Sequence, residues 1–583
     1  MPTESQPVHD VVVERNVTAR MRDGTALRAD VYRPKAPGRY PIILERTPYS
    51  KETGGETRTG APEFYAKRGY AVVIQDTRGR FSSYGDFYPF RDEGWDEHPD
   101  GYDTVEWLAS QPWSNGKVGT IGGSYSGVTQ YRLAPTRPPH LAAMFVRESS
   151  ADYHDEWVYR GGAFELGFMI AWARGLAYNN LAHFLKGPEL EQKRRELEQV
   201  EKDIGKWHLR LPLTPNPFVK GFCDWYDEML EHPDNSPYWS RWDIERRHSD
   251  IETPIYHQGA WFDLFLAGTL KNFTGMRRNA RAPEARRNQK LVIGPWVHGP
   301  EFVGKRVVGE FDFGPEAELD IHAFRLPWFD HWLKGMDNGI EGRKPVRLFI
   351  MGVNRWRDED GWPLPDTRYV PWYLRGGNPA SRDARSLNDG TLSAEAPAST
   401  EQGDSYDYDP ADPVLTHGGS TLNLPGGAFD QREVEARCLT YTSAPLQRAM
   451  EVTGPVKVVL HAASSAPDTD WVARLCDVSP DGYSRNLCDG ILRARYREST
   501  WQQSLIEPGK VYRYVIDLWA TSNVFLPGHR IRVTVTSSNF PRYDRNLNTG
   551  GPQNTETRWQ VAHNTVFHDE SRPSHILLPV IER

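Results

Sequence analysis

A serine at position 124 lies in a turn that could present its hydroxyl as a nucleophile. The stretch from Lys117 to Gly127, KVGTIGGSYSG, begins as a short apolar strand and passes through a glycine-rich turn into a helix-compatible run. A nucleophile on such an elbow needs small residues two positions before and two after it, because the backbones crowd there. Gly122 and Ser126 fill these positions, and Ser126 stands where glycine is usual. An ordinary surface turn is the alternative interpretation.

Two later loops carry the residue types that would activate a serine hydroxyl. Serine is a poor nucleophile until a base takes its proton, and that base is normally a histidine oriented by a carboxylate. Asp263 follows the apolar run 253–257, and His298 follows the apolar run 289–293. The chain order Ser124, Asp263, His298 is the order found in α/β-hydrolases. We therefore predict a catalytic triad, although each residue alone is compatible with an ordinary loop.

The segments around these residues alternate between strand and helix patterns. Helical spacing occurs at 61–68 and 102–110. The runs separated by Asp23-Gly24 predict an N-terminal hairpin. Such alternation indicates an α/β fold with right-handed crossovers. The continuous apolar runs that suit strands buried on both faces of a largely parallel sheet are 41–45, 70–75, 118–121, 141–146, 253–257 and 289–293.

Two further parts complete the predicted organisation. Between 151 and 250 the chain has an apolar helical run at 164–185 and a charged run at 189–203, which indicate a helical cap inserted over the strand ends. From about residue 346, short β-rich runs separated by Pro/Gly turns are typical of a β-sandwich. The predicted parts are the α/β domain at 1–150 and 251–345, the cap at 151–250 and the β-sandwich at 346–583.

Composition excludes several classes of function. The 583-residue chain has a net charge of −8, which gives no reason to expect nucleic acid or an anionic membrane as a partner. Its start, MPTESQP, lacks the features of a signal peptide, and no run approaches a membrane span, so we expect a cytoplasmic protein. Four scattered cysteines argue against a disulfide framework or a CxxC metal site. Cys476 and Cys488 flank a turn, so we expect thiols on adjacent strands.

Several stretches together resemble the CocE/NonD hydrolase family, a group of serine esterases, α-amino-acid ester hydrolases, glutaryl cephalosporin acylases and X-Pro dipeptidyl-peptidases. The resemblance covers nearly the whole chain. Its motifs are RDGT at 22–25, ADVYRP at 29–34, RTPY at 46–49, QDTRGR at 75–80, the GGSYSG elbow at 122–127, the Asp263 and His298 loops, WFDHWLKG at 328–335 and the segments 486–497 and 572–574.

The resemblance implies a role for each matching residue. Ser124 would be the nucleophile, His298 the general base and then acid, and Asp263 the residue that orients it. Tyr49 would supply its hydroxyl to the oxyanion hole, and Tyr125 would supply its backbone N–H. The resemblance also implies that the C-terminal β-sandwich is a jelly roll. A core tyrosine bonded to a carbonyl is the alternative for Tyr49.

The resemblance also suggests what the substrate site contains. In the α-amino-acid ester hydrolases, acidic residues close after the catalytic aspartate hold the substrate ammonium group, whereas Leu264, Phe265 and Leu266 follow Asp263 here. The cap segment 157–164, with Trp172 beyond it, resembles the esterase branch, where two tryptophans and a phenylalanine enclose an aromatic acyl group. We therefore predict Trp157, Trp172 and Phe265 as substrate-binding residues. Packing in the cap core is the alternative, and an amine site built from Asp155 and Glu156 remains open.

The sequence therefore predicts a serine hydrolase that cleaves a small-molecule carboxylic ester through an acyl-serine intermediate, with no metal and no organic cofactor. The first alternative is an amide hydrolase with the same triad, of the acylase or X-Pro dipeptidyl-peptidase type. The second, from another class, is a non-catalytic ligand-binding protein on the same fold. The sequence leaves a homo-oligomer open.

Overall fold

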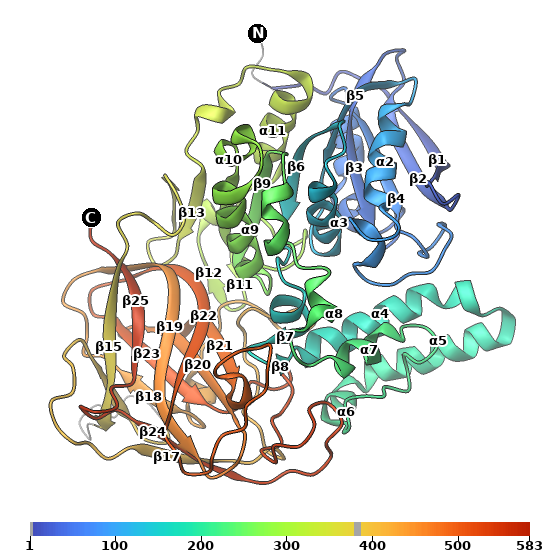
Figure 1. The fold of residues 1–583 in the computed structure, drawn as a ribbon. Coiled ribbons are helices and arrows are strands. Elements are labelled where there is room, and N and C mark those ends of the chain that lie inside the picture. The colour runs from blue at the N-terminus through green and yellow to red at the C-terminus, as the bar shows by residue number, and fades with distance from the viewer. Residues whose placement is uncertain (1–3, 378–385) are drawn as a thin grey trace.

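The computed structural model describes residues 4–377 and 386–583, and it has three parts (Figure 1). An α/β domain holds the N-terminal segments and the green to yellow segments that follow the cap. The cap projects from it as a group of helices, and an all-β domain forms the C-terminal part. Residues 1–3, with which the segment MPTESQP begins, lie outside the described residues. Within the described residues, no helix is long and apolar enough to cross a membrane.

The α/β domain is built on a ten-stranded sheet with the order β1-β2-β4-β3-β5-β6-β9-β10-β13-β14. The strands from β4 to β13 in this order pair in parallel, and the edge strands β1, β2 and β14 pair antiparallel. Their bounds are β1 (Val11–Arg20), β2 (Ala26–Pro34), β3 (Tyr40–Thr47), β4 (Ala71–Asp76), β5 (Ser114–Thr120), β6 (Leu141–Arg147), β9 (Ile255–Phe262), β10 (Lys290–Val297), β13 (Val346–Ile350) and β14 (Arg355–Glu359).

Helices cover both faces of this sheet because successive strand residues point to opposite sides. Ile42 and Leu44 of β3 pack in one cluster with residues of α2 and α3, and Ile43 packs in another with residues of α1 and α11. The six predicted apolar runs are all strands of this sheet, and the hairpin at Asp23-Gly24 joins β1 to β2. The helices of the domain are α1 (Ala61–Ala66), α2 (Asp100–Ala109), α3 (Tyr125–Leu133), α9 (Leu266–Asn279), α10 (Pro283–Arg287) and α11 (His322–Lys334).

The predicted start of the β-sandwich at residue 346 needs a correction. Val346 pairs in parallel with Leu291, so β13 extends the first sheet, and β14 follows it as the edge strand. The second sheet begins instead with β15 (Arg368–Gly377). A five-residue apolar run has no feature that identifies its sheet, because its pairing partner lies more than fifty residues away in the chain.

The cap consists of short strands and helices, and α4 and α5 extend away from the rest of the molecule (Figure 1). Helix α5 contains the charged run, and only Leu197 and Val200 of it are buried, so most of this helix faces solvent. A two-stranded sheet, β7 (Tyr159–Arg160) and β8 (Ala163–Phe164), precedes the helices. Those helices are α4 (Leu166–Phe184), α5 (Gly187–Lys202), α6 (Ile204–Leu209), α7 (Trp225–Glu231) and α8 (Pro237–Ser240).

The C-terminal domain is a jelly-roll β-sandwich, and it includes the short helix α12 (Arg432–Glu435). Cys476 and Cys488 lie on its adjacent strands β20 and β21, and all four cysteines of the chain are free thiols. A small hairpin, β11 (Val307–Val308) and β12 (Phe311–Asp312), precedes α11. The strands after β15 are β16 (Gly390–Ser393), β17 (Asp404–Tyr408), β18 (Leu439–Thr442), β19 (Met450–Ser464), β20 (Asp470–Val478), β21 (Ser484–Arg493), β22 (Tyr512–Phe525), β23 (Arg530–Thr536), β24 (Ala562–Phe567) and β25 (His575–Ile581).

Candidate active site

Ser124 lies in a strained turn between β5 and α3. Its backbone has φ 57° and ψ −125°, a conformation that residues with side chains rarely adopt outside functional sites. A Cβ atom on Gly122 would lie 2.5 Å from the Cβ of Ser126, and one on Gly127 would lie 2.6 Å from the Cβ of Ser149. Because Gly122 has no Cβ atom, a serine fits at position 126. Because Gly127 has none either, α3 can approach the segment after β6. This explains the unusual GGSYSG spacing.

His298 and Asp263 lie at the carboxyl ends of the neighbouring strands β10 and β9. Nδ1 of His298 and Oδ1 of Asp263 are 2.8 Å apart, and both side chains are buried. Burial raises the pKa of Asp263, and the hydrogen bond to His298 offsets part of this effect. The carboxylate can therefore hold the imidazole with Nε2 free to accept a proton.

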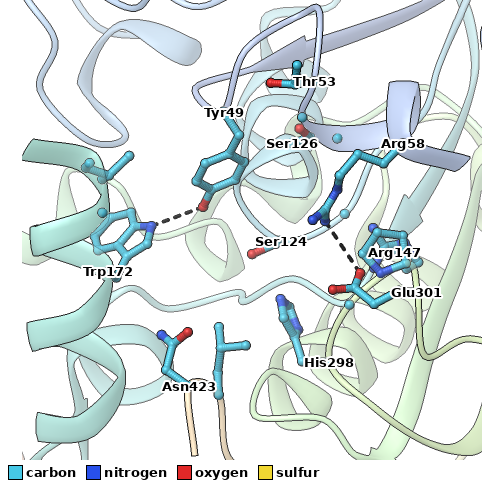
Figure 2. A pocket seen from close by; sticks show the side chains of 18 of the residues that line it. Tyr49, Thr53, Arg58, Ser124, Ser126, Arg147, Trp172, His298, Glu301 and Asn423 are labelled. Atoms are coloured by element: carbon cyan, nitrogen blue, oxygen red, sulfur yellow. Dashed lines mark hydrogen bonds and ion pairs between the residues drawn. The ribbon is translucent and has the colours of Figure 1, made fainter. Parts of the chain in front are cut away.

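Tyr49 places its hydroxyl beside Ser124 (Figure 2). In this view the Ser124 hydroxyl lies between the Tyr49 hydroxyl and the His298 ring. Nε1 of Trp172 donates a hydrogen bond of 3.0 Å to the Tyr49 oxygen. That oxygen is then the acceptor, so its own proton is free to point into the cavity. Tyr125 is the first residue of α3, where a backbone N–H has no acceptor within the helix.

A cavity of about 430 Å³ opens above these residues, and all three parts of the chain line it. The α/β domain contributes Tyr49, Ser124 and His298, the cap contributes Trp172, and the C-terminal domain contributes Leu422 and Asn423. Figure 2 also shows an ion pair in the cavity wall, in which Nη2 of Arg58 lies 3.4 Å from Oε2 of Glu301. The remaining lining residues are Glu45, Thr53, Gly54, Gly55, Arg58, Gly123, Ser126, Arg147, Ala171, Arg174, Gly175, Leu176, Asn179, Gly299, Pro300, Glu301 and Phe302.

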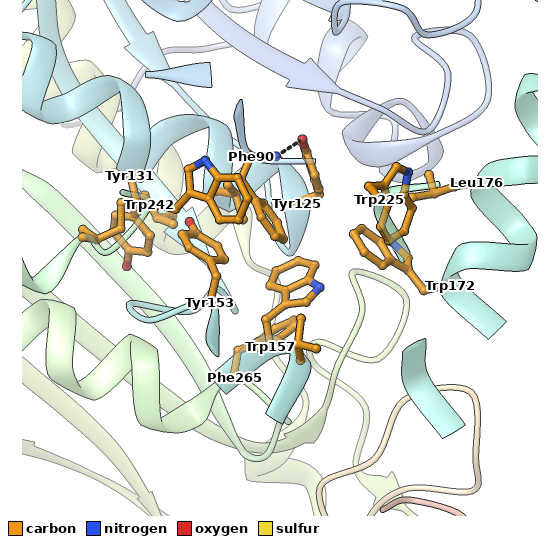
Figure 3. Packing of buried hydrophobic residues seen from close by; sticks show 14 of the residues in the cluster. Phe90, Tyr125, Tyr131, Tyr153, Trp157, Trp172, Leu176, Trp225, Trp242 and Phe265 are labelled. Carbon is orange, nitrogen blue, oxygen red and sulfur yellow. Dashed lines mark hydrogen bonds between the residues drawn. The ribbon is translucent and has the colours of Figure 1, made fainter. Parts of the chain in front are cut away.

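The three predicted aromatic residues differ in position. Trp172 lines the cavity, whereas Trp157 and Phe265 are fully buried and stack with their ring centroids 4.4 Å apart. They belong to an aromatic cluster with Phe90 and Tyr153 (Figure 3), and they are not part of the cavity lining. Phe265 also contacts the edge of the His298 ring, at 5.2 Å between centroids. These two residues therefore lie behind the cavity wall.

A buried network of charged side chains lies beneath the Ser124 turn. Burial and the charge of Glu56 raise the pKa of Glu45 to about 8. Burial also opposes ionisation of Glu56, but the adjacent Arg325, whose Nη1 is 2.7 Å from Oε2 of Glu56, lowers the pKa of Glu56 to about 2. Of this pair, Glu45 is therefore the carboxylate that keeps its proton to higher pH, and Glu56 is the one that ionises first. In the described residues, no group of three His, Cys, Asp or Glu residues could hold a metal ion.

Sequence reasoning missed Glu148 and the interaction of Trp172 with Tyr49. Glu148 directly follows β6, and its Oε2 lies 3.7 Å from Nδ1 of His298. The same signal that identified Asp263 and His298, a polar residue just after an apolar strand, was present at Glu148. The Trp172 contact joins the cap to the α/β domain across 123 positions of the chain, and no local pattern reports such a contact.

A largely parallel sheet with a serine elbow, a buried carboxylate and a histidine in the loops after its strands defines an α/β-hydrolase of the serine type. Residues 23–300 match the X-Pro dipeptidyl-peptidase (S15) family, and residues 338–577 match the X-Pro dipeptidyl-peptidase C-terminal non-catalytic domain. The cocaine esterase of Rhodococcus sp. (strain MB1 Bresler) is 39% identical, covering 98% of this chain and 99% of that protein. This chain belongs to the CocE/NonD family of serine hydrolases and is a carboxylic-ester hydrolase.

Solved structures that resemble the whole chain include an ester hydrolase and a peptidase. An α-amino-acid ester hydrolase has a TM-score of 0.79 at 26% identity, covering 98% of this chain and 97% of the other. An aminopeptidase from a marine sediment Thaumarchaeota archaeon has a TM-score of 0.83 at 26% identity, with the same coverage. The three-part architecture is therefore shared by ester hydrolases and by a peptidase.

Proposed function

We propose that this enzyme hydrolyses a carboxylic ester with an aromatic acyl group, with Ser124 as nucleophile, His298 as base and Asp263 as its orienting carboxylate. Tyr49 and the backbone N–H of Tyr125 form the proposed oxyanion hole. One observation carries the proposal: the hydroxyls of Ser124 and Tyr49 and the ring of His298 face one cavity, with Asp263 bonded behind the ring.

In the acylation step, the Ser124 oxygen attacks the ester carbonyl carbon while Nε2 of His298 takes the hydroxyl proton. The carbonyl oxygen becomes an oxyanion that accepts hydrogen bonds from the Tyr49 hydroxyl and the Tyr125 N–H. Collapse of this intermediate breaks the bond to the alcohol oxygen, and His298 returns the proton to that oxygen. The products of this step are an acyl-serine and a free alcohol.

In the deacylation step, water repeats the same sequence. Nε2 of His298 takes a proton from water, the resulting hydroxide attacks the acyl carbon, and the same two donors stabilise the oxyanion. Collapse returns the proton to the Ser124 oxygen and releases the carboxylic acid. Asp263 stays ionised throughout and stabilises the imidazolium that forms in both steps.

The aromatic acyl site is proposed from the position of the three aromatic residues. Trp172 forms part of the cavity wall, and Trp157 and Phe265 lie directly behind it. Trp172 is the member of this group that an acyl group on Ser124 can contact directly, and an aromatic ring packs well against its indole. Aromatic acyl groups are therefore expected to react faster than aliphatic groups of equal length.

The amide alternative is kept because the S15 family and the archaeal aminopeptidase share this architecture. An aminopeptidase needs a free carboxylate for the substrate ammonium group. Leu264, Phe265 and Leu266 are buried and apolar. The carboxylate of Asp155 lies 2.6 Å from His154, and that of Glu156 lies 2.8 Å from Lys271. Neither acid is part of the cavity lining. These contacts favour the ester.

A comparison of substrates that differ in their acyl group and in their leaving group tests the proposal. We expect p-nitrophenyl benzoate to be hydrolysed with a higher kcat/KM than p-nitrophenyl hexanoate, whose aliphatic acyl group has a similar length, and both to exceed the matching p-nitroanilides and Gly-Pro-p-nitroanilide. Ser124→Ala should remove all of these activities. Faster cleavage of Gly-Pro-p-nitroanilide than of either ester would support the peptidase alternative instead.

A further inference from the structure

Glu148 occupies a position between the nucleophile and the histidine in the sheet. The neighbouring parallel strands β5, β6, β9 and β10 precede Ser124, Glu148, Asp263 and His298, in this spatial order. Parallel strands place their carboxyl ends at one edge of the sheet. Glu148 is therefore the residue that the fold inserts between the Ser124 strand and the two strands of the Asp263–His298 pair.

The backbone of Glu148 is held in a conformation that costs free energy. Its φ is 46°, in the left-handed region that favours glycine, and its side chain is fully buried. The Glu148 N–H donates a hydrogen bond of 2.7 Å to the carbonyl of Gln258 in β9. Strain of this kind costs on the order of 1 kcal/mol and persists only where the surroundings enforce it. A glycine would avoid this cost, so the glutamate side chain needs a separate explanation.

Glu148 contacts both halves of the candidate triad. Its carbonyl oxygen accepts a hydrogen bond of 3.0 Å from the backbone N–H of Ser124. Its carboxylate oxygen Oε2 accepts a hydrogen bond of 3.0 Å from the N–H of Gly299, the residue after His298. The same oxygen lies 3.7 Å from Nδ1 of His298. One residue therefore contacts the nucleophile turn through its backbone and the histidine loop through its side chain.

The charges around this carboxylate limit what it can do electrostatically. Nη1 of Arg147 donates a hydrogen bond of 2.6 Å to Oε2 of Glu148, and Nε2 of Gln258 lies 3.3 Å from Oε1. The cavity wall also carries the ion pair of Arg58 and Glu301. Because Arg147 offsets the Glu148 charge, the larger contribution of the carboxylate is to fix distances and angles.

We propose that Glu148 is a positioning residue that sets the separation of Ser124 and His298 and acts as a second carboxylate toward His298. It holds the Ser124 N–H and the Gly299 N–H at fixed points while Asp263 holds Nδ1. When the imidazole gains the serine proton, the resulting cation faces two carboxylates. This inference rests on the proposed function, because it assigns Glu148 a role in the same Ser124 and His298 chemistry.

Glu148→Gly separates a structural role from a positioning role. The glycine relieves the backbone strain, so we expect a melting temperature equal to or above that of the other Glu148 variants. We also expect kcat to fall roughly 100-fold with KM within about threefold, because small misplacements of catalytic groups cost this much. Wild-type kcat in a folded Glu148→Gly protein would overturn the proposal.

Two conservative variants and a matched control refine this test. Glu148→Gln keeps the size but removes the charge, and Glu148→Asp keeps the charge but shortens the reach. We expect both to lower kcat by roughly 10-fold, as for loss of a hydrogen bond to a charged group. Glu435→Gln is the control, because Glu435 is also buried and its Oε2 lies 2.7 Å from Nη1 of Arg532, in the C-terminal domain. Equal effects of Glu435→Gln and Glu148→Gln on kcat would contradict the inference.

A double-mutant cycle tests the contact with His298. In the Asp263→Ala background, Glu148 is the remaining carboxylate near Nδ1, so we expect Glu148→Gln to lower residual kcat at least threefold more than it does in the wild type. If Glu148→Gln lowers kcat by the same factor in both backgrounds, Glu148 does not act as a second carboxylate toward His298. Labelling with a fluorophosphonate distinguishes the two levels of failure. An unlabelled wild type would refute the proposed function, whereas a labelled wild type with unaltered Glu148 variants would refute this inference alone.

Discussion

The hydroxyl of Tyr49 is useful to catalysis because of the hydrogen bond that it already accepts. The indole N–H of Trp172 donates to the Tyr49 oxygen at 3.0 Å, which leaves the phenol proton as the free donor beside Ser124. Burial also raises the pKa of Tyr49, so the phenol keeps its proton at neutral pH. A neutral donor that is oriented before substrate binds needs little reorganisation in the transition state.

Tyr49→Phe removes this donor and keeps the ring. We expect kcat for p-nitrophenyl esters to fall roughly 100- to 1000-fold with little change in KM, as for other oxyanion-hole donors. Tyr406→Phe is the control, since it removes a buried phenol that bonds Ser537 in the C-terminal domain. A Tyr49→Phe enzyme with wild-type kcat would exclude this tyrosine from the oxyanion hole.

Trp172→Phe removes the indole donor to Tyr49 and also reduces the ring that forms part of the cavity wall. One neutral hydrogen bond contributes about 0.5 to 1.5 kcal/mol, so we expect kcat to fall roughly 2- to 10-fold. The effect should disappear in a Tyr49→Phe background, because no phenol is left to orient. Kinetics of the two single variants and the double variant measure this coupling. If the changes in activation free energy of the two single variants simply add in the double variant, Trp172 acts only as a wall of the cavity.

At the scale of elements, the Ser124 turn depends on close contacts between the start of α3 and the segment after β6. Gly127→Ala would place a methyl group 2.6 Å from the Cβ of Ser149. We expect a loss of roughly 1 to 3 kcal/mol in stability from overpacking, together with lower activity. Gly205→Ala in α6 is the control, because a Cβ there meets nothing within 4 Å. Thermal unfolding compares the two, and equal melting temperatures would contradict this account of the motif.

Elements were predictable from the sequence where a local pattern defines them. The parallel strands could be predicted because continuous apolar runs indicate burial on both faces, and Ser124, Asp263 and His298 follow three of them. β13 was misassigned because pairing partners distant in the chain decide which sheet a short strand joins. Trp157 and Phe265 show a similar limit, since aromatic residues that line a cavity and those packed behind its wall have the same sequence pattern.

At the scale of the whole molecule, stability should depend on pH through Glu45. Its pKa is raised to about 8 in the folded protein and is near 4.5 when unfolded, so folding favours the protonated form. The contribution of Glu45 to the free energy of unfolding is therefore complete below pH 4.5 and is lost as pH rises toward 8. Glu56, with its pKa lowered to about 2, contributes above pH 4.5 and stays constant in this window.

Glu45→Gln should therefore change how stability varies with pH. We expect the difference in melting temperature, variant minus wild type, to increase as pH rises from 5 to 8.5. Glu63→Gln, which alters an exposed carboxylate, is the control. A constant difference between Glu45→Gln and wild type across this range would show that Glu45 ionises normally in the folded enzyme.

The most direct test of the central claim is to label the intact enzyme with a fluorophosphonate and map the modified residue by peptide mass spectrometry. The account predicts one phosphonate per chain on Ser124, no labelling of Ser124→Ala, and much slower labelling of a folded His298→Ala variant. An unlabelled wild type, or a label that persists in Ser124→Ala, would contradict the catalytic assignment and favour a ligand-binding protein on the same fold.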